Sequence, residues 1–223
     1  MNDLKPILAI ETSDVLCGCA LYFSEEHFYS TSLVLKNSHS SKLFSLIEYI
    51  LKESRIDPQE LDSVAVSEGP GSFTGLRIGM SAAKGIAVGA GLPIIPVPTF
   101  EAFAFQLSHF LNDCTNFIIA NRVNKNEVYY ARFQVDSNNY IFVEQLTILN
   151  NTDFIRKSTN IKTFGNAASI LGEPVSERKT PSAPAPEFVA SWARNFGMNR
   201  KTSNYDYLEP NYLKNFHIKE KKQ

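Results

Sequence analysis

Apolar and polar positions in the first half of the chain alternate between strand-like and helix-like patterns. Residues 7–10 and 17–23 are apolar runs on either side of a short polar turn, which predicts a β-hairpin. Residues 37–53 carry apolar side chains at helical spacing and predict an amphipathic helix. Residues 63–67 predict a buried strand that leads through a glycine-rich loop into a helix over residues 74–91. This alternation is typical of an α/β fold.

The remainder of the chain repeats this alternation more weakly. A strand is predicted at residues 92–97 and a helix at residues 99–111. Residues 127–149 have the β-rich alternation of a hairpin, with its turn at residues 136–139. Residues 186–198 predict a last helix. We therefore expect a second and smaller unit after the first.

Composition and charge exclude several classes of protein. The 223 residues are 43% hydrophobic and 20% charged, as in ordinary globular proteins, and they are enough for one large domain or two small lobes. The net charge of −1 creates no global field that attracts nucleic acid, so any RNA contact is expected to be local or made by a partner. No apolar stretch approaches the ~20 residues of a membrane span, and the N-terminus lacks a signal-peptide pattern. We expect a cytoplasmic protein.

The three cysteines do not form a disulfide framework. Their odd and small number indicates reduced thiols. Cys17 and Cys19 lie two residues apart in a predicted strand and therefore face the same side, whereas Cys114 is distant in the sequence. We interpret Cys17 and Cys19 as small core residues rather than as a pair of metal ligands.

The segment SEGPGSFTGLRIGMSAAKG, residues 67–85, combines a glycine-rich loop with a helix. It is not a P-loop, because a P-loop needs Gly-Lys-Ser/Thr and Gly75 is followed by Leu76. It also departs from the dinucleotide-binding pattern Gly-x-Gly-x-x-Gly, because one residue too many separates Gly71 from Gly75. A glycine loop between a strand and a helix N-terminus still favours an anion, so phosphate contact is one interpretation. A tight turn that joins the strand to a closely packed helix is the other interpretation, and the spacing alone favours it.

The helix within this segment has two faces suited to packing. Gly75 and Gly79 belong to a nearly smooth face that another backbone can approach closely, while Leu76 and Met80 lie on an apolar face. The earlier amphipathic helix has an apolar stripe that Leu46 widens beyond the needs of one packing surface. Both helices are therefore predicted to pack on their own sheet and on another protein.

Residues 69–87, GPGSFTGLRIGMSAAKGIA, closely resemble the signature of the TsaB (YeaZ) family. Other family segments follow in the same order, so the resemblance covers nearly the whole chain. These segments are ILAIETS near the start, HSSKL at residues 39–43, NEVYYARF at 126–133 and EPNYLKN at 209–215.

The resemblance implies a two-lobed α/β fold of the actin/sugar-kinase/Hsp70-like (ribonuclease H-like) type. The first lobe, with the partner-docking helices, is expected over residues 1–104. The second, reduced lobe and the C-terminal tail are expected over residues 105–223, with a tail that can pack back on the first lobe.

The resemblance also implies a function. Members of this family are understood as non-catalytic partners of TsaD. The subunits TsaD and TsaE act with them to transfer a threonylcarbamoyl group to the tRNA adenosine beside the anticodon, and TsaD resembles the catalyst. The chain is thus expected to be a scaffold subunit and pseudo-enzyme that forms a heterodimer with TsaD. Contact with TsaE and tRNA is expected through the complex, and the chain could form a homodimer when alone. No cofactor is expected on this chain by itself, with ATP or ADP at the partner interface left open. The alternative is a stand-alone small-molecule kinase or metallopeptidase of the same fold.

The spacing of possible metal ligands helps to distinguish a non-catalytic subunit from a stand-alone enzyme of the same fold. The catalytic relative carries His-x-x-x-His on the first-lobe helix, where two imidazoles four residues apart can share one metal. Here His39 is followed four residues later by Leu43, so the second ligand is absent. His27, His109 and His217 show no ligand spacing. We therefore expect no metal site and no catalytic residue.

Two sets of candidate site residues follow from the resemblance. The residues expected to bind the partner in a helix bundle are His39, Leu43, Leu46, Ile50, Leu76, Arg77, Met80 and Lys84. The residues that could make a relic phosphate or nucleotide contact are Glu11, Thr12, Ser13, Gly69, Gly71 and Ser72.

The sequence departs from the family pattern at two positions, Glu11 and Arg122. Glu11 replaces the usual aspartate, and Arg122 stands where the family often has an acidic residue. The first departure mildly weakens a nucleotide site, and the second puts in doubt any role of the acidic residue at the cleft or partner surface. The basic residues of the tail, from Lys214 to Lys222, could touch tRNA, although a solvated terminus is the favoured interpretation.

Overall fold

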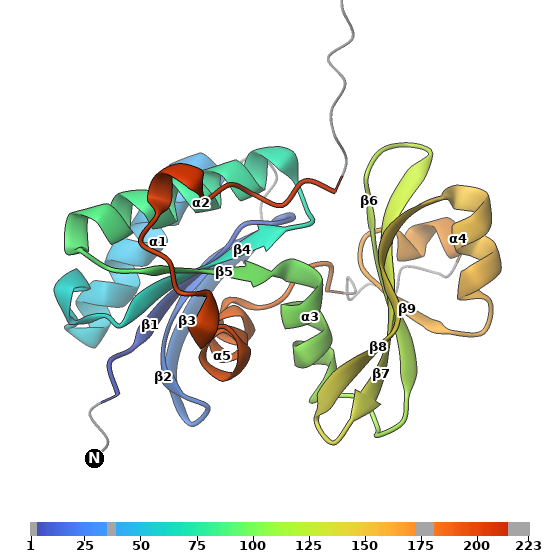
Figure 1. Ribbon diagram of the computed structural model, residues 1–223, viewed down its shortest axis with the longest axis horizontal. Helices are drawn as coiled ribbons and strands as arrows, with labels where there is room; N and C mark the ends of the chain where they lie inside the picture. The colour runs from blue at the N-terminus through green and yellow to red at the C-terminus, as the bar shows by residue number, and fades with distance from the viewer. Residues whose placement is uncertain (1–3, 35–38, 173–180, 214–223) are drawn as a thin grey trace, which may run out of the picture.

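The computed structural model describes residues 4–34, 39–172 and 181–213, which fold into two lobes that are each built on one β-sheet (Figure 1). The first lobe has a five-stranded sheet with the strand order β3-β2-β1-β4-β5. Its strands are β1 (Ile7–Glu11), β2 (Leu16–Ser24), β3 (His27–Val34), β4 (Ser63–Gly69) and β5 (Ile94–Pro98).

Helices cover both faces of the first sheet (Figure 1). The pair α1 and α2 packs on one face, and α3 and α5 pack on the other. Their bounds are α1 His39–Ser54, α2 Phe73–Ala90, α3 Thr99–Ser108 and α5 Pro186–Phe196. Leu8 and Ile10 point from β1 toward the first pair, whereas Ile7 and Ala9 point toward the second. This burial on both faces explains why β1 reads as a continuous apolar run.

The second lobe has a four-stranded sheet with the order β8-β7-β6-β9. Its strands are β6 (Asn116–Arg122), β7 (Glu127–Asp136), β8 (Asn139–Asn150) and β9 (Lys162–Phe164). The β7–β8 hairpin turns at Ser137 and Asn138, whose φ angles are 52° and 62°. Two positive φ angles are the geometry that a tight hairpin favours, and the turn predicted at residues 136–139 is confirmed.

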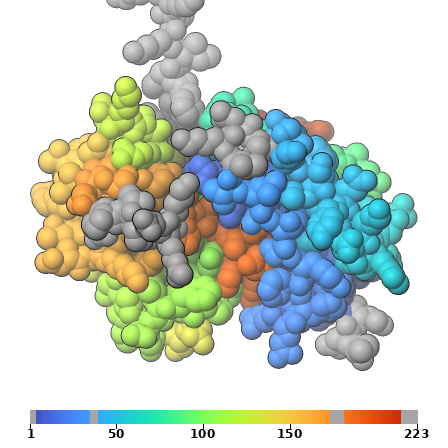
Figure 2. All heavy atoms as spheres, turned by 180° about the vertical axis from the view of Figure 1, so that it is seen from behind, coloured from blue at the N-terminus to red at the C-terminus, as the bar shows by residue number. Residues whose placement is uncertain are grey.

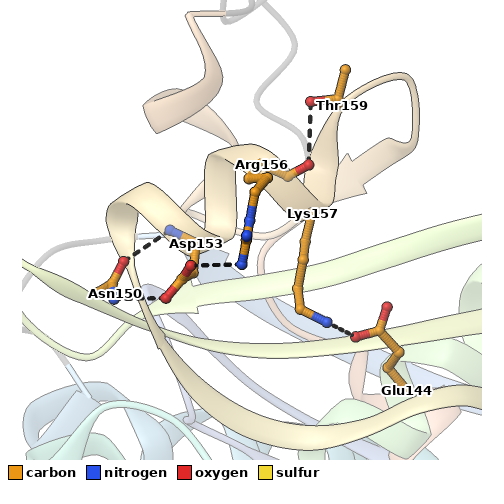
Figure 3. A network of polar contacts seen from close by, with 6 residues as sticks. All are labelled: Glu144, Asn150, Asp153, Arg156, Lys157 and Thr159. Carbon is orange, nitrogen blue, oxygen red and sulfur yellow. Dashed lines mark hydrogen bonds and ion pairs between the residues drawn. The ribbon is translucent and has the colours of Figure 1, made fainter.

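Helix α4 (Asn151–Ser158) closes the outer face of the second sheet (Figure 3). The Asn150 side chain caps its N-terminus by accepting a hydrogen bond of 2.8 Å from the Asp153 backbone N–H. At the other end, the Lys157 ammonium donates to the Glu144 carboxylate on β8. Polar contacts thus attach both ends of α4 to the sheet.

Two strands were not anticipated from the sequence, and one helix lies elsewhere than expected. Strand β3 is an exposed edge strand and β9 has only three residues, so neither produces a strong hydrophobic pattern. The sequence assigned residues 105–223 to the second lobe apart from a returning tail. The structure corrects this for α5, which buries Val189 and Ala190 against the first sheet. The chain therefore returns to the first lobe before its tail begins.

Cys17 and Cys19 are fully buried between the first sheet and α1, which confirms that they are core residues. Burial raises the pKa of Cys17 to about 11 and that of Cys19 to about 12. Both thiols therefore stay protonated at neutral pH and have little nucleophilic character.

Candidate partner-binding groove and the glycine loop

The glycine loop before α2 packs directly on the turn that follows β1. A Cβ atom on Gly75 would lie 2.0 Å from the Thr12 carbonyl oxygen, and one on Gly71 would lie 2.4 Å from the Ser13 carbonyl oxygen. The Ser72 backbone N–H donates to the Ser13 carbonyl at 2.6 Å. The Thr12 hydroxyl donates to the Gly75 carbonyl at 2.8 Å. These glycines are required because two backbones meet, which supports the tight-turn interpretation.

Glu11 is held inside this junction. Its carboxylate accepts hydrogen bonds from the Ser13 backbone N–H and from the Ser67 hydroxyl. Burial raises the pKa of Glu11 from its ordinary value of 4.5 to about 7, although both hydrogen bonds oppose this shift. The Glu11 oxygens are therefore engaged within the chain itself.

The N-terminus of α2 is also occupied by the protein's own groups. Ser72 is the N-cap residue, and its hydroxyl accepts a hydrogen bond of 3.2 Å from the Gly75 N–H. Gly69 ends β4, and its N–H donates to the Thr99 hydroxyl at 3.1 Å. Of the six residues predicted to touch phosphate, Gly69 ends β4, and the other five lie at the junction of the loop and the turn. Phosphate contact itself stays a prediction.

Four of the residues expected to contact a partner lie instead in the protein's own core. Leu43, Ile50, Leu76 and Met80 are buried between α1, α2 and the first sheet. The prediction that they face a partner is wrong, because the first sheet packs on the apolar stripe of these helices. A charged residue at Met80 would disrupt this core rather than only an interface.

The other expected contacts have different positions. Arg77 is exposed, Leu46 and Lys84 are half-buried, and His39 is the first residue of α1. The structure adds two exposed aromatic side chains that the prediction missed, Phe44 and Phe73. Phe44 directly follows Leu43 in the amphipathic helix predicted over residues 37–53. The apolar stripe of this helix is wider than one packing surface needs, and this width was the feature of the sequence that indicated an apolar side chain outside the core.

These exposed side chains border a groove between α1 and α2, with a volume of about 470 Å³. We call it the α1–α2 groove. It is lined by Ser40, Phe44, Phe73, Thr74, Arg77, Ile78, Ser81 and Ala82.

Arg77 is held in a defined position at this groove. The central carbon of its guanidinium lies 3.9 Å from the centre of the Phe73 ring, which is a close cation–π contact. Its Nε–H donates to the Tyr212 hydroxyl at 3.0 Å, so the C-terminal segment also reaches this site. A cation fixed beside apolar surface suits a partner that offers a carboxylate next to an apolar side chain.

Arg122 contacts the second lobe at the side that faces the first. Its backbone N–H donates to Asn166 Oδ1 at 2.7 Å, and its guanidinium donates to the Ser169 hydroxyl at 3.1 Å. Asn166 in turn donates to the Asp14 carboxylate across the two lobes at 3.4 Å. This arginine therefore supports a loop near the lobe boundary, where the family pattern has an acidic residue.

The described part of the chain offers neither a cluster of metal ligands nor a membrane-spanning helix. No group of three or more His, Cys, Asp or Glu side chains in residues 4–34, 39–172 and 181–213 could hold a metal ion. Within the same ranges, no helix has the length and apolarity needed to cross a lipid bilayer. His217 and the basic tail from Lys214 to Lys222 lie outside the described residues.

Comparison with known proteins reveals related sequences. A family model described as TsaD: tRNA N6-adenosine threonylcarbamoyltransferase matches residues 33–147. The chain is 29% identical to the tRNA threonylcarbamoyladenosine biosynthesis protein TsaB of Escherichia coli K12, over 94% of each chain. It is 31% identical to TsaB of Buchnera aphidicola (Baizongia pistaciae), over 71% of this chain and 72% of that protein. Its alignment to TsaB of Haemophilus influenzae has 35% identity but spans only 52% of that protein.

A solved structure supports the same assignment at the level of the fold. The chain superposes on YeaZ from Pseudomonas aeruginosa with a TM-score of 0.74 and 22% identity, covering 94% of this chain and 100% of that one. The expected α/β fold with two lobes is confirmed.

The fold and the helix-lined groove thus define a two-lobed α/β protein with a candidate docking surface on its first lobe. The sequence comparisons narrow this class further. The chain belongs to the TsaB family.

Proposed function

We propose that this chain is a non-catalytic subunit in tRNA threonylcarbamoyladenosine biosynthesis and that its α1–α2 groove binds a TsaD-like catalytic subunit. The observation that carries the proposal is the open groove on the helix pair, with Phe44 and Phe73 exposed beside Arg77. The names of the relatives support the pathway. The match of residues 33–147 to the TsaD family supports a partner with a related fold.

The groove has the parts that a protein interface needs. Exposed aromatic side chains supply apolar area, and an arginine already fixed by Phe73 and Tyr212 loses little side-chain entropy on binding. Related folds can pair through equivalent helices, so the same groove would serve a homodimer when the partner is absent. The TsaE-like ATPase and tRNA would meet this chain through the assembled complex in the cytoplasm.

The interior of the glycine-loop junction supports a non-catalytic role. Glu11 is engaged by Ser13 and Ser67, and the loop lies in backbone contact with the turn. A magnesium–phosphate group would have to displace these contacts. The chain alone is therefore proposed to hold no cofactor, and ATP or ADP would bind only at the interface with the partner.

Size-exclusion chromatography with light scattering tests the docking surface. The TsaD-type protein of the same genome is mixed with the wild type, with Phe44→Glu and with Tyr49→Glu. Tyr49 is the matched control, because it lies on the same helix and is 58% exposed against 59% for Phe44, but does not line the groove. We expect Phe44→Glu to lose the heterodimer and Tyr49→Glu to keep it. If both variants bind like the wild type, the interface is elsewhere.

Calorimetry with ATP and magnesium tests the non-catalytic role. We expect no saturable binding and no hydrolysis by the isolated chain. Tight binding with hydrolysis would instead support a stand-alone kinase of the same fold. Hydrolysis of peptides that depends on added metal would support the metallopeptidase alternative.

A further inference from the structure

A second hollow lies on the other side of the first sheet from the α1–α2 groove. It has a volume of about 370 Å³, within the range of small-molecule sites, which is about 300–1,000 Å³. In the view of Figure 2, orange residues of the α5 region lie between blue residues of the first lobe and green residues. We call this hollow the α5 pocket. Its lining residues are Tyr22, Glu25, Phe28, His109, Phe110, Glu187, Phe188 and Ser191.

Aromatic rings form the walls of the α5 pocket. Phe188 contributes the centre of this wall, with ring-centre distances of 6.2 Å to Phe110 and 5.5 Å to His109. On the other side, Phe28 stacks on Tyr22 at 6.3 Å. Phe110 is 73% exposed although it borders a cluster of rings, so a large apolar side chain at the pocket edge faces solvent. Aromatic faces carry negative partial charge and attract cations.

The charged side chains that line the α5 pocket are carboxylates. Glu25 lies in the turn between β2 and β3, and it has no hydrogen-bond or ion-pair partner among the described residues. Glu187 stands in the first turn of α5, where its Oε2 accepts a hydrogen bond of 2.5 Å from the Ser30 hydroxyl. Neither lysine nor arginine appears among the lining residues. The lining itself therefore carries negative charge, and a nearby cation is Arg194 on α5, which acts electrostatically on Tyr22.

His109 adds a hydrogen-bond acceptor to this lining. Its Nδ1 lies 2.8 Å from the Phe105 carbonyl oxygen, and a carbonyl oxygen can only accept a hydrogen bond. Nδ1 must therefore carry the proton, which leaves Nε2 of the neutral ring as an acceptor. The Tyr22 hydroxyl donates to the Ser191 hydroxyl at 3.2 Å, so its proton is already engaged within the lining.

We propose that the α5 pocket binds a small alkylammonium ion of the polyamine class. Its ammonium groups would pair with Glu25 and Glu187, and its methylene chain would pack against Phe110 and Phe188. A hydrated magnesium ion fits this lining poorly, because it prefers oxygen ligands and has no use for aromatic walls. An anion is repelled by both carboxylates. This inference is independent of the proposed docking to a TsaD-like subunit.

Titration calorimetry on the full chain at physiological salt tests the proposal, with spermidine and putrescine as the probes. Butane-1,4-diol has the putrescine chain without charge, and magnesium chloride supplies charge without a chain. We expect saturable binding of the two amines and none of the diol or of magnesium.

Paired variants separate the pocket from general attraction to an acidic surface. Glu25→Gln with Glu187→Gln removes two negative charges in the pocket. Glu48→Gln with Glu53→Gln removes two exposed charges on α1, which lies on the other face of the sheet. We expect the pocket pair to weaken spermidine binding about tenfold or more and the α1 pair to leave it unchanged. Phe110→Ala, at a mostly exposed site, should weaken it severalfold without affecting the fold.

Three results would overturn the proposal. The first is the absence of saturable amine binding up to about 1 mM, the range of weak specific ligands. The second is an equal loss of binding in the pocket pair and the α1 pair, which would indicate diffuse electrostatic attraction. The third is unchanged binding in Phe110→Ala together with binding of magnesium, which would indicate a simple carboxylate site.

Discussion

The α1–α2 groove and the α5 pocket lie on opposite faces of the same sheet and share exposed phenylalanines, but their charges are opposite. Arg77 borders the groove, whereas Glu25 and Glu187 border the pocket. Aromatic surface supplies contact area in both places and does not by itself choose a ligand. The charged neighbours make that choice, so the groove suits an acidic partner and the pocket suits a cation.

The two hollows also differ in what positions their walls. The α2 wall of the groove begins at the glycine loop, which rests on the turn after β1. The pocket wall comes from α5, which follows the second lobe in the sequence and returns to the first sheet. A change in the loop should therefore damage the groove first, and a change remote from both hollows should matter least.

Gly75→Ala should have the largest effect, because the new Cβ would lie 2.0 Å from the Thr12 carbonyl oxygen. We expect the free energy of unfolding to fall by about 3 kcal/mol, measured by urea denaturation. Gly85→Ala on the same helix meets nothing within 4 Å and should raise stability by about 0.5–1 kcal/mol. Equal effects of the two substitutions would show that the loop contact does not constrain α2.

Glu11→Gln should change how stability depends on pH. Because the folded pKa of Glu11 is about 7, against an ordinary 4.5, the folded state holds this proton more tightly than the unfolded chain. Wild-type stability then falls as pH rises through this window, and it is lowest above pH 7. A glutamine side chain cannot ionise, so the variant should gain on the order of 2 kcal/mol relative to wild type between pH 5 and pH 8. Urea denaturation at both pH values measures the difference.

The same gain at pH 5 as at pH 8 would contradict a buried, titrating carboxyl at this position. The comparison of the two hollows adds a second readout to this experiment. Partner binding through the groove should change with Glu11, which lies under α2, whereas spermidine binding at the α5 pocket should not.

Arg77→Ala should weaken binding of the TsaD-like partner by about tenfold, since interface arginines commonly contribute more than 1 kcal/mol. Lys84→Ala serves as the control, because Lys84 is half-buried on the same helix and does not line the groove. We expect less than about a twofold change for it. Surface plasmon resonance measures the affinity of both variants for the TsaD-like partner. A larger effect at Lys84 would move the interface toward the C-terminus of α2.

Lys157→Met should have the smallest effect, because its ion pair with Glu144 (Figure 3) joins two residues of the second lobe that line neither hollow. The Lys157 hydrogen bond holds the pKa of Glu144 below its ordinary value, so this contribution is present at neutral pH and lost in acid. Both side chains are more than 30% exposed, which limits the loss of stability to about 0.5–1 kcal/mol. Denaturation at pH 7 measures it. Neither partner binding nor spermidine binding should change.

The local elements of the chain could be predicted from its sequence alone. Continuous apolar runs predicted β1 and β4, helical spacing predicted α1 and α2, and turn residues placed the β7–β8 hairpin at residues 136–139. These features depend on neighbours along the chain, whose periodicity and backbone preferences can be read directly. The spacing of the glycines likewise favoured a tight turn that joins the strand to a closely packed helix.

Which surfaces remain free depends on the tertiary structure. Leu43 and Phe44 are adjacent and both apolar, yet the first is buried under the sheet and the second borders the groove. The pocket depends on α5 returning to the first sheet beside a β2–β3 turn that lies far away in the sequence. Burial is a property of what packs against a side chain, and that neighbour is set by long-range contacts rather than by local pattern.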